Sequence, residues 1–322
     1  MFYHFTLHND LHWFPGAWVA VDLFFILSGF VISHSYWGSI SNGMSLAQFI
    51  AARILRLAPL YFIGLAIGTA AAILALRSGQ SLNLDASGIF SRFILALSFI
   101  PYLNGGPIFP LNDPSWSLFF EVFVNIIFFW HIRKWGSPSG IILVCAAAVA
   151  FLVGTLATGR TNPGWATGHF SLGFPRAIAE FFAGCLIYQT GIYRRTTSSG
   201  MVVTLTALTF LGFLIDKGKV GFISSLTIIP LTISFASSAK LTPRVRRVCI
   251  ALGEISYPLY IIHYPVYFTA QATRAISQHD QVTQTLILAA ASTIFSAALI
   301  GPDRRFRTFF SEWLEGVRRA KG

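Results

Sequence analysis

Long apolar runs separated by short polar segments follow one another along the whole chain. A run of about 20 apolar residues is long enough to cross the hydrocarbon core of a bilayer as a helix. The pattern predicts about nine full transmembrane helices, at residues 17–36, 57–76, 117–132, 139–158, 172–190, 201–215, 220–238, 249–270 and 284–301. The expected fold class is therefore an all-α polytopic membrane protein, a bundle of helices.

One further apolar run, residues 89–103, is short and has Ser91 and Arg92 near its start. Arginine and lysine accumulate on the cytoplasmic side of membrane proteins. The basic clusters share that side only if residues 89–103 do not cross, so we expect a re-entrant or interfacial segment there. The clusters are Arg53 with Arg56, Arg133 with Lys134, Arg194 with Arg195, residues 240–247, and the tail from Arg304 to Lys321. Residues 103–116, which contain glycine and proline, are then expected to fold over a cavity on the outer side.

The two ends of the chain differ from its middle. After a membrane-embedded domain of residues 1–302, residues 303–322 have apolar side chains at helical spacing among arginines. This pattern predicts a basic amphipathic cytoplasmic tail on the inner membrane surface. Residues 1–7 look like the last turns of a truncated first helix whose beginning is missing.

Composition agrees with the membrane interpretation. The 322 residues are 54% hydrophobic and 11% charged, whereas soluble domains carry about 25% charged residues. The net charge of +11 sits between apolar runs, where it orients helices, so no nucleic-acid partner is expected. Cys145, Cys185 and Cys249 have the spacing of neither a zinc site nor a disulfide framework. No nucleotide-binding P-loop is present in the sequence.

Ionisable residues inside the predicted spans are functional candidates, because each costs about 2.5–3.5 kcal/mol at the bilayer centre. Arg176 and Glu180 are four residues apart, so they either pair with each other or belong to a substrate site. Asp22 either pairs structurally or takes part in catalysis. His263 is either a buried, hydrogen-bonded histidine or part of a substrate site.

Three further groups carry candidate chemistry. Glu121 follows Trp116 and Ser117 and is placed to orient a catalytic histidine or to accept a hydroxyl proton. Arg53 and Arg56 are one helical turn apart where an apolar run begins, so they either anchor that helix or clamp an anion.

His4, His8 and His12 are spaced four residues apart, as ligands on one helix face would be. Pro15 and the polar residues before it predict that the helix ends soon after His4, so no metal site is expected.

These motifs, in this order, resemble those of the acyltransferase-3 family of integral membrane acyltransferases, which includes O-antigen and exopolysaccharide O-acetylases. The matching segments are YHF (3–5), GAWVAVDLFFILSGFVI (16–32), RILRLAPLY (53–61), WSLFFE (116–121), PRAIAEFFAG (175–184) and LGEISYPLYIIHYPV (252–266). The resemblance implies about ten membrane helices with both termini cytoplasmic, in a bacterial-type inner membrane. It also implies transfer of an acyl group, usually acetyl from acetyl-CoA, to a hydroxyl of a carbohydrate or other cell-envelope acceptor.

The resemblance assigns roles residue by residue. His4 matches the family's essential histidine, Arg53 and Arg56 match its paired arginines, and Trp116, Ser117 and Glu121 match its WSLxxE-type motif. The arginines are then expected to hold the phosphates of acyl-CoA, which is a donor substrate and not a permanently bound cofactor.

Two mechanisms stay open at this point. In the first, His4 is a general base for the acceptor hydroxyl, with Glu121 or Asp22 orienting the imidazole. In the second, His4 becomes acylated.

One departure from the family concerns an arginine that lies eleven residues before the essential histidine, a position that would precede Met1. Either the start codon is placed too late or the chain is a truncated and inactive version. In the first case, which the helix stub at residues 1–7 favours, we expect the upstream sequence, read in frame, to encode about 15–25 further residues that complete a span.

The competing class is a membrane transporter or carrier of an acylated or anionic small molecule. It explains the spans and the buried charges but not the two motifs in this order, and an assay of acyl transfer separates the two classes.

Overall fold

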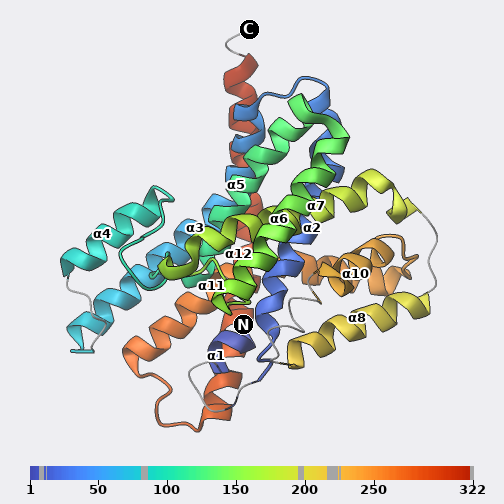
Figure 1. Ribbon diagram of the computed structural model, residues 1–322. Helices are drawn as coiled ribbons and strands as arrows, with labels where there is room; N and C mark the ends of the chain where they lie inside the picture. Colours follow the sequence, from blue (N-terminus) through green and yellow to red (C-terminus); the bar gives the residue numbers. More distant parts are fainter. Residues whose placement is uncertain are drawn as a thin grey trace.

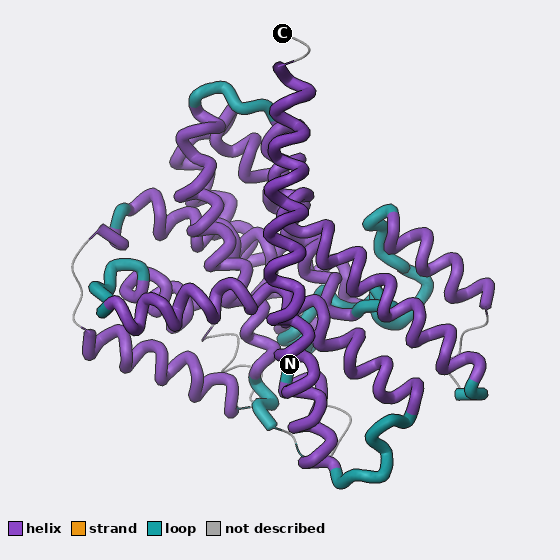
Figure 2. The backbone as a smooth tube through the Cα atoms, turned by 180° about the vertical axis from the view of Figure 1, so that it is seen from behind, coloured by secondary structure: helices purple, strands orange, loops and turns teal. Residues whose placement is uncertain are grey.

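The computed structural model describes residues 1–6, 11, 13–80, 86–194, 199–215, 224 and 226–319. The regular elements of this part are helices, joined by loops (Figures 1 and 2). The α-helices are α1 (Phe2–Thr6), α2 (Ala20–Ser41), α3 (Leu46–Arg77), α4 (Ala86–Leu97), α5 (Trp116–Trp130), α6 (Gly136–Thr158), α7 (Phe170–Thr190), α8 (Ser199–Leu214), α10 (Ile228–Ala236), α11 (Pro243–Thr273) and α12 (Gln281–Arg319).

Six helical segments of the described chain are long and apolar enough to cross a membrane. They are Ala17–Ser41, Leu46–Arg77, Asp113–Lys134, Gly140–Thr158, Thr167–Thr190 and Gln281–Phe310. Each contains or overlaps one of the predicted spans, so the protein is an all-α, multi-pass membrane protein.

The predicted count of nine spans is not confirmed. α8 has 16 residues and α10 has 9, and much of the predicted span 220–238 lies outside the described residues. α11 has 31 residues but does not reach the same apolarity. Polar side chains interrupt its apolar sequence, and several of them line the two cavities described below.

The centre of the bundle is built from two helix pairs, α2 against α7 and α3 against α11. α2 and α7 touch backbone to backbone, because a Cβ atom added to Gly29 would lie 1.8 Å from the carbonyl oxygen of Phe181. One added to Gly184 would lie 1.9 Å from the carbonyl oxygen of Ile26. Such small residues are what close helix packing inside a membrane requires.

α4 lies at the periphery, beside one end of α3 (Figure 1). Its 12 residues extend over about 18 Å, which is too short to cross a hydrocarbon core of about 30 Å. The length agrees with the expectation of a segment that does not cross. Residues 103–116 are largely irregular, as expected, and pack on the loop before α7: the amide of Ile108 donates to Trp165 O at 2.9 Å.

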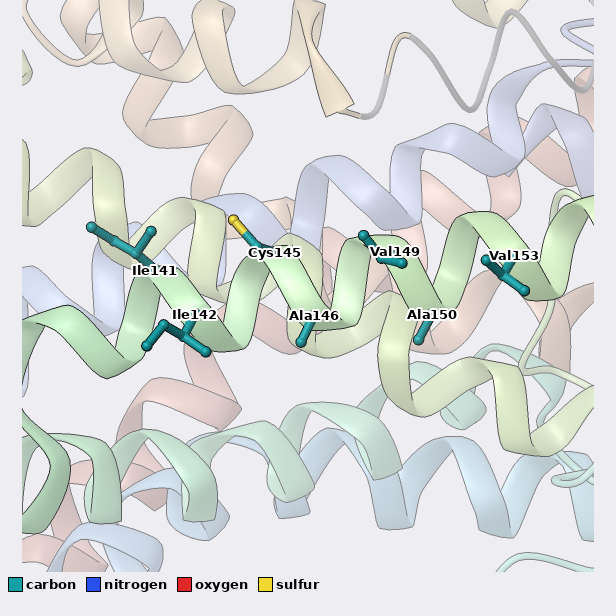
Figure 3. Close-up of a pocket in the computed structure, with 7 residues that line it drawn as sticks. All are labelled: Ile141, Ile142, Cys145, Ala146, Val149, Ala150 and Val153. Carbon is teal, nitrogen blue, oxygen red and sulfur yellow. The ribbon is translucent and has the colours of Figure 1, made fainter.

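α6 presents a shallow apolar groove on the outside of the bundle (Figure 3). It is lined by Ile141, Ile142, Cys145, Ala146, Val149, Ala150 and Val153. Because α6 contains a candidate span, this face suits contact with lipid chains.

α12 runs through Pro302 to Arg319 as one helix, the long element that ends near the C-terminus in Figure 1. The tail predicted from residue 303 is therefore helical up to Arg319, but it continues the preceding span. Its place on the membrane surface remains a prediction.

Candidate active site

A cavity of about 620 Å³ lies between α1, the start of α2, α11 and two loops. We call it the histidine cavity. Its polar and aromatic lining includes Tyr3, His4, Trp18, Phe24, Asp113, Trp116, Asn162, Trp165, Tyr260, His263 and Tyr264. These side chains come from distant parts of the sequence and are brought together by the bundle.

Two histidines lie beside each other in this cavity. The ring centroids of His4 and His263 are 5.1 Å apart. Nδ1 of the buried His263 lies 2.9 Å from the carbonyl oxygen of Leu259. A carbonyl only accepts hydrogen bonds, so Nδ1 carries the proton of this contact, and Nε2 presents a lone pair in the neutral ring. Nε2 has no hydrogen-bond partner among the described atoms.

The buried, hydrogen-bonded alternative for His263 is therefore seen at one ring nitrogen, and the substrate-site alternative stays a prediction. His8 and His12 lie outside the described residues, so the histidine stripe is described only at His4. Within the described part of the chain, no group of three His, Cys, Asp or Glu side chains is placed to hold a metal ion.

A second cavity, of about 180 Å³, lies between α2, α3, α5 and α11. We call it the arginine cavity, because Arg53 and Arg56 line it together with Ser28, Ser117, Glu121, Ser256 and Tyr257. α3 starts at a capping box in which Ser45 and Gln48 bond each other reciprocally. The two arginines therefore stand inside an established helix, on its cavity side.

The two arginines have different surroundings. Arg53 is buried, and its Nη2 donates to Oε1 of Glu121 at 2.5 Å. Ser28 donates to the same oxygen at 3.1 Å. Arg56 is exposed and makes no ion pair with any described residue. Glu121 is thus placed against Arg53, in a different cavity from His4, and its expected role in orienting the histidine remains a prediction.

The two cavities adjoin at Phe24 and Tyr260, which line both of them. We call these two rings the partition; their centroids are 5.5 Å apart. The hydroxyl of Tyr260 donates to Pro114 O at 2.9 Å and lies 2.7 Å from Oγ of Ser117. Ser117, which the resemblance places in the WSLxxE-type motif, therefore contacts the partition, while its neighbour Trp116 lines the histidine cavity. A substrate-binding role for either residue stays a prediction.

A buried charge cluster supports the histidine cavity from behind. Arg176 is fully buried; its Nε and Nη2 donate to Oδ1 of Asp22, and its Nε lies 3.5 Å from Oε1 of Glu180. The pairing of Arg176 with Glu180 suggested by their spacing is therefore present, with Asp22 as an additional partner. The guanidinium carbon lies 5.8 Å from the ring centre of Trp18 and 5.5 Å from that of Trp116, two walls of the cavity.

Asp113 is a candidate that the sequence reasoning did not find. It lines the histidine cavity, and its Oδ1 is buried without a hydrogen-bond partner among the described atoms. An acidic residue between Asn112 and Pro114 in a loop is normally a solvated turn residue, so its type and position do not predict a place in a functional site. The available signal is its place three residues before Trp116.

Comparison with known proteins identifies the family of the chain. The family model described as an acyltransferase domain, Acyl_transf_3, matches residues 1–301. The chain belongs to the acyltransferase-3 family. It is an acyltransferase that transfers groups other than aminoacyl groups.

Curated relatives of this acyltransferase carry acyltransferase and polysaccharide names. It is 28% identical to the exopolysaccharide production protein ExoZ of Rhizobium meliloti (strain 1021), over 94% of this chain and 89% of that protein. It is 22% identical to the peptidoglycan O-acetyltransferase OatA of Listeria monocytogenes, over 89% of this chain and 52% of OatA. It is 26% identical to the acyltransferase MdmB of Streptomyces mycarofaciens, over 77% of this chain and 67% of MdmB. No solved structure matches.

The geometry of this acyltransferase separates two kinds of chemistry. The histidine cavity offers basic nitrogens and aromatic walls, which suit proton transfer from a bound hydroxyl. The arginine cavity offers an exposed guanidinium, which suits an anionic group such as a phosphate.

Proposed function

We propose that the protein is a membrane O-acyltransferase that moves an acyl group, such as acetyl, from acyl-CoA to a hydroxyl of a cell-envelope carbohydrate. The observation that carries this proposal is the meeting of a histidine cavity and an arginine cavity at one pair of rings, Phe24 and Tyr260. The printed names of ExoZ and OatA, which refer to exopolysaccharide and peptidoglycan, support a carbohydrate acceptor.

The donor is assigned to the arginine cavity. Coenzyme A carries a pyrophosphate and a 3′-phosphate, and arginine binds such groups through paired N–H donors. Arg56 is the exposed cation of this cavity, and Arg53 beside it is fixed by Glu121. Arg307 of α12 is close enough to act on Arg56 electrostatically, so α12 adds positive charge near the same place.

This assignment also sets the topology. Acyl-CoA is made in the cytoplasm, so we place the arginine cavity and the basic end of α12 on the cytoplasmic face of a bacterial-type inner membrane. The positive charge of that end agrees with the positive-inside rule. The histidine cavity then faces the opposite side, where envelope glycans are found.

The acyl group reaches the acceptor across the partition. One turn of α11 separates Tyr260 from Ser256 on one side, and about one turn separates it from His263 on the other. The pantetheine arm extends from the arginine cavity along this helix face and presents the thioester to the histidine cavity when the two rings separate.

The chemical step is general-base catalysis. His4 takes the proton of the acceptor hydroxyl as its oxygen forms a bond to the thioester carbonyl carbon. The carbon–sulfur bond then breaks, and the coenzyme A thiolate receives that proton from the imidazolium. Nε2 of His263, unpaired and in the same cavity, is an acceptor beside His4 that can orient its ring.

The test is acyl transfer by the purified protein in lipid nanodiscs, with radiolabelled acetyl-CoA and a panel of envelope polysaccharides. We expect His4→Ala to lower transfer by at least about a hundredfold, the usual contribution of a general base. His279→Ala is the matched control, because His279 is exposed and lines neither cavity. Acetyl-CoA binding without transfer, or full transfer by His4→Ala, would reject the proposal in favour of a carrier or of another base.

A further inference from the structure

Two polar side chains in the histidine cavity come from elements that do not carry the histidines. Asp113 precedes α5, and Asn162 lies in the loop before α7. Neither is needed for the proton transfer described above, and neither is explained by packing alone.

The carboxylate of Asp113 is short of a partner. Its Oδ1 is buried and accepts no hydrogen bond from any described atom. An unsatisfied buried acceptor costs free energy, so the carboxyl of Asp113, which as a whole is only partly buried and lines the cavity, gains from a donor supplied on the cavity side. The charge of Asp113 acts on Tyr260 and Tyr264, the residues three before and one after His263. The carboxylate therefore lies near the part of the cavity where proton transfer is proposed.

The orientation of Asn162 is fixed by Arg176. Nη1 of Arg176 donates to Oδ1 of Asn162 at 2.7 Å, and to Pro163 O at 2.8 Å. Because a guanidinium only donates, the carbonyl end of the Asn162 amide faces Arg176, and the NH₂ end is left to donate elsewhere. Arg176 is itself locked by Asp22, so this donor is held rigidly at the cavity wall.

The remaining wall is aromatic. Trp18, Trp116 and Trp165 line the cavity, and its volume of about 620 Å³ is within the range of about 300–1,000 Å³ usual for small-molecule sites. The cavity therefore combines flat apolar faces with one carboxyl group and one fixed amide donor. A sugar ring has the matching chemistry: apolar C–H faces and hydroxyls that both donate and accept.

The charged groups around the cavity restrict the range of rings that it can bind. The described lining of the cavity contains no lysine or arginine, and Arg176 beside it is paired with Asp22. A carboxylated or phosphorylated ring would therefore find no unpaired lysine or arginine here, which disfavours it relative to an uncharged ring.

We propose that Asp113 and Asn162 form the acceptor subsite of the enzyme and bind the hydroxyls of an uncharged sugar ring against the tryptophan walls. This inference rests on the proposed acyltransferase function and assigns the acceptor within it. Asp113 accepts a hydrogen bond from one hydroxyl, Asn162 donates to another, and the hydroxyl to be acylated faces His4.

The first experiment measures acetyl transfer from radiolabelled acetyl-CoA to p-nitrophenyl glucoside in nanodiscs. We expect Asp113→Asn to raise the KM for the acceptor about ten- to a hundredfold, as expected for loss of a hydrogen bond to a charged group. The KM for acetyl-CoA, which is assigned to the other cavity, is expected to stay unchanged. Asn104→Ala is the control, since Asn104 is exposed in the same loop and lines neither cavity.

The second experiment needs no variant, so it tests the acceptor subsite even if Asp113→Asn does not fold. The unaltered enzyme is expected to acetylate the methyl ester of p-nitrophenyl glucuronide at least tenfold faster than p-nitrophenyl glucuronide, a pair with the same hydroxyls that differs in the charge at C6. Equal rates for these two acceptors, or an unchanged acceptor KM in a folded Asp113→Asn variant, would overturn the subsite and leave the acyltransferase proposal standing. Absence of transfer to every acceptor by the unaltered enzyme would instead overturn the acyltransferase proposal itself.

Discussion

Replacing Arg53 and Arg56 one at a time separates an arginine that holds the fold from one that binds the donor. A symmetrical clamp predicts the same phenotype for Arg53→Ala and Arg56→Ala. The structure predicts different ones, because Arg53 is buried against Glu121 whereas Arg56 is exposed at the rim of the arginine cavity.

The surroundings of Glu121 determine how much Arg53→Ala lowers the free energy of unfolding. The side chains of Arg53 and Glu121 are 7% and 16% exposed, and removing one partner of a buried ion pair costs about 3–5 kcal/mol. Ser28 keeps its hydrogen bond to Glu121, and the adjoining cavity admits water, so we expect the lower end, about 3 kcal/mol. Arg56→Ala is expected to change the free energy of unfolding by less than about 0.5 kcal/mol.

The assays measure stability and donor binding separately. Unfolding is followed by tryptophan fluorescence during SDS titration in mixed micelles, and coenzyme A binding by isothermal titration calorimetry. Arg56→Ala is expected to weaken coenzyme A binding about ten- to a hundredfold. Arg56→Lys is expected to restore it in part, because lysine lacks the forked donors.

A double variant tests the assignment of Arg53. Arg53→Ala with Glu121→Gln removes both charges, so it is expected to recover much of the stability that Arg53→Ala loses. Wild-type stability of Arg53→Ala, with the same loss of coenzyme A affinity as Arg56→Ala, would refute this reasoning and restore the symmetrical clamp.

Two further predictions concern the helices that carry the site. Gly184→Ala is expected to lower the free energy of unfolding by about 1–3 kcal/mol, as an overpacked contact does, because the added Cβ would meet the carbonyl oxygen of Ile26. Gly200→Ala is the control, because nothing lies within 4 Å of a Cβ added there. Equal SDS midpoints for the two variants would contradict the contact. Asp280 accepts hydrogen bonds from the hydroxyl and from the amide of Thr283. These bonds, the hydroxyl's being the larger effect, hold the pKa of the Asp280 carboxyl below its ordinary value of 3.8. The charged cap of α12 is therefore expected to be complete above that value and lost as the pH falls through the lower folded-state pKa. The hydrogen-exchange protection factors of the first turn of α12, which correct for the pH dependence of intrinsic exchange, should fall there and in Asp280→Ala at neutral pH; unchanged protection in Asp280→Ala would show that the cap contributes nothing.

The sequence predicted what depends on local spacing. Apolar length located six of the spans, and the i, i+4 spacing of Arg176 and Glu180 indicated their pairing. The motif resemblance named Arg53 and Glu121 as members of two separate motifs. The two residues are 68 positions apart, and nothing in the sequence indicated that they form a hydrogen bond with each other. Whether α8 and α11 cross the membrane was least predictable, because polar cavity-lining residues lower the apolarity of α11 and the described α8 has only 16 residues.

The site depends on contacts between segments far apart in the chain. His4 and His263 come from opposite ends of the sequence, and Asp22 reaches Arg176 across 154 positions. Asp113 was missed because a loop carboxylate beside a proline has an ordinary local explanation, and only the folded cavity shows that its oxygen lacks a donor. Burial of a polar atom is a tertiary property, so no window of sequence contains it.

The partition of Phe24 and Tyr260 also has an electrical consequence. An enzyme that draws its two substrates from opposite faces of a membrane risks forming a conducting pore, and each elementary charge that crosses 100 mV releases about 2.3 kcal/mol. Two rings lie at the junction of the two cavities, and one of them is fastened through the Tyr260 hydroxyl to Ser117 and Pro114, so we expect them to narrow the passage. Acyl groups, which are uncharged, can pass such a constriction while ions are held back. If donor and acceptor occupy the two cavities as proposed, the same pair of rings is expected to let the enzyme work in an energised membrane without discharging it.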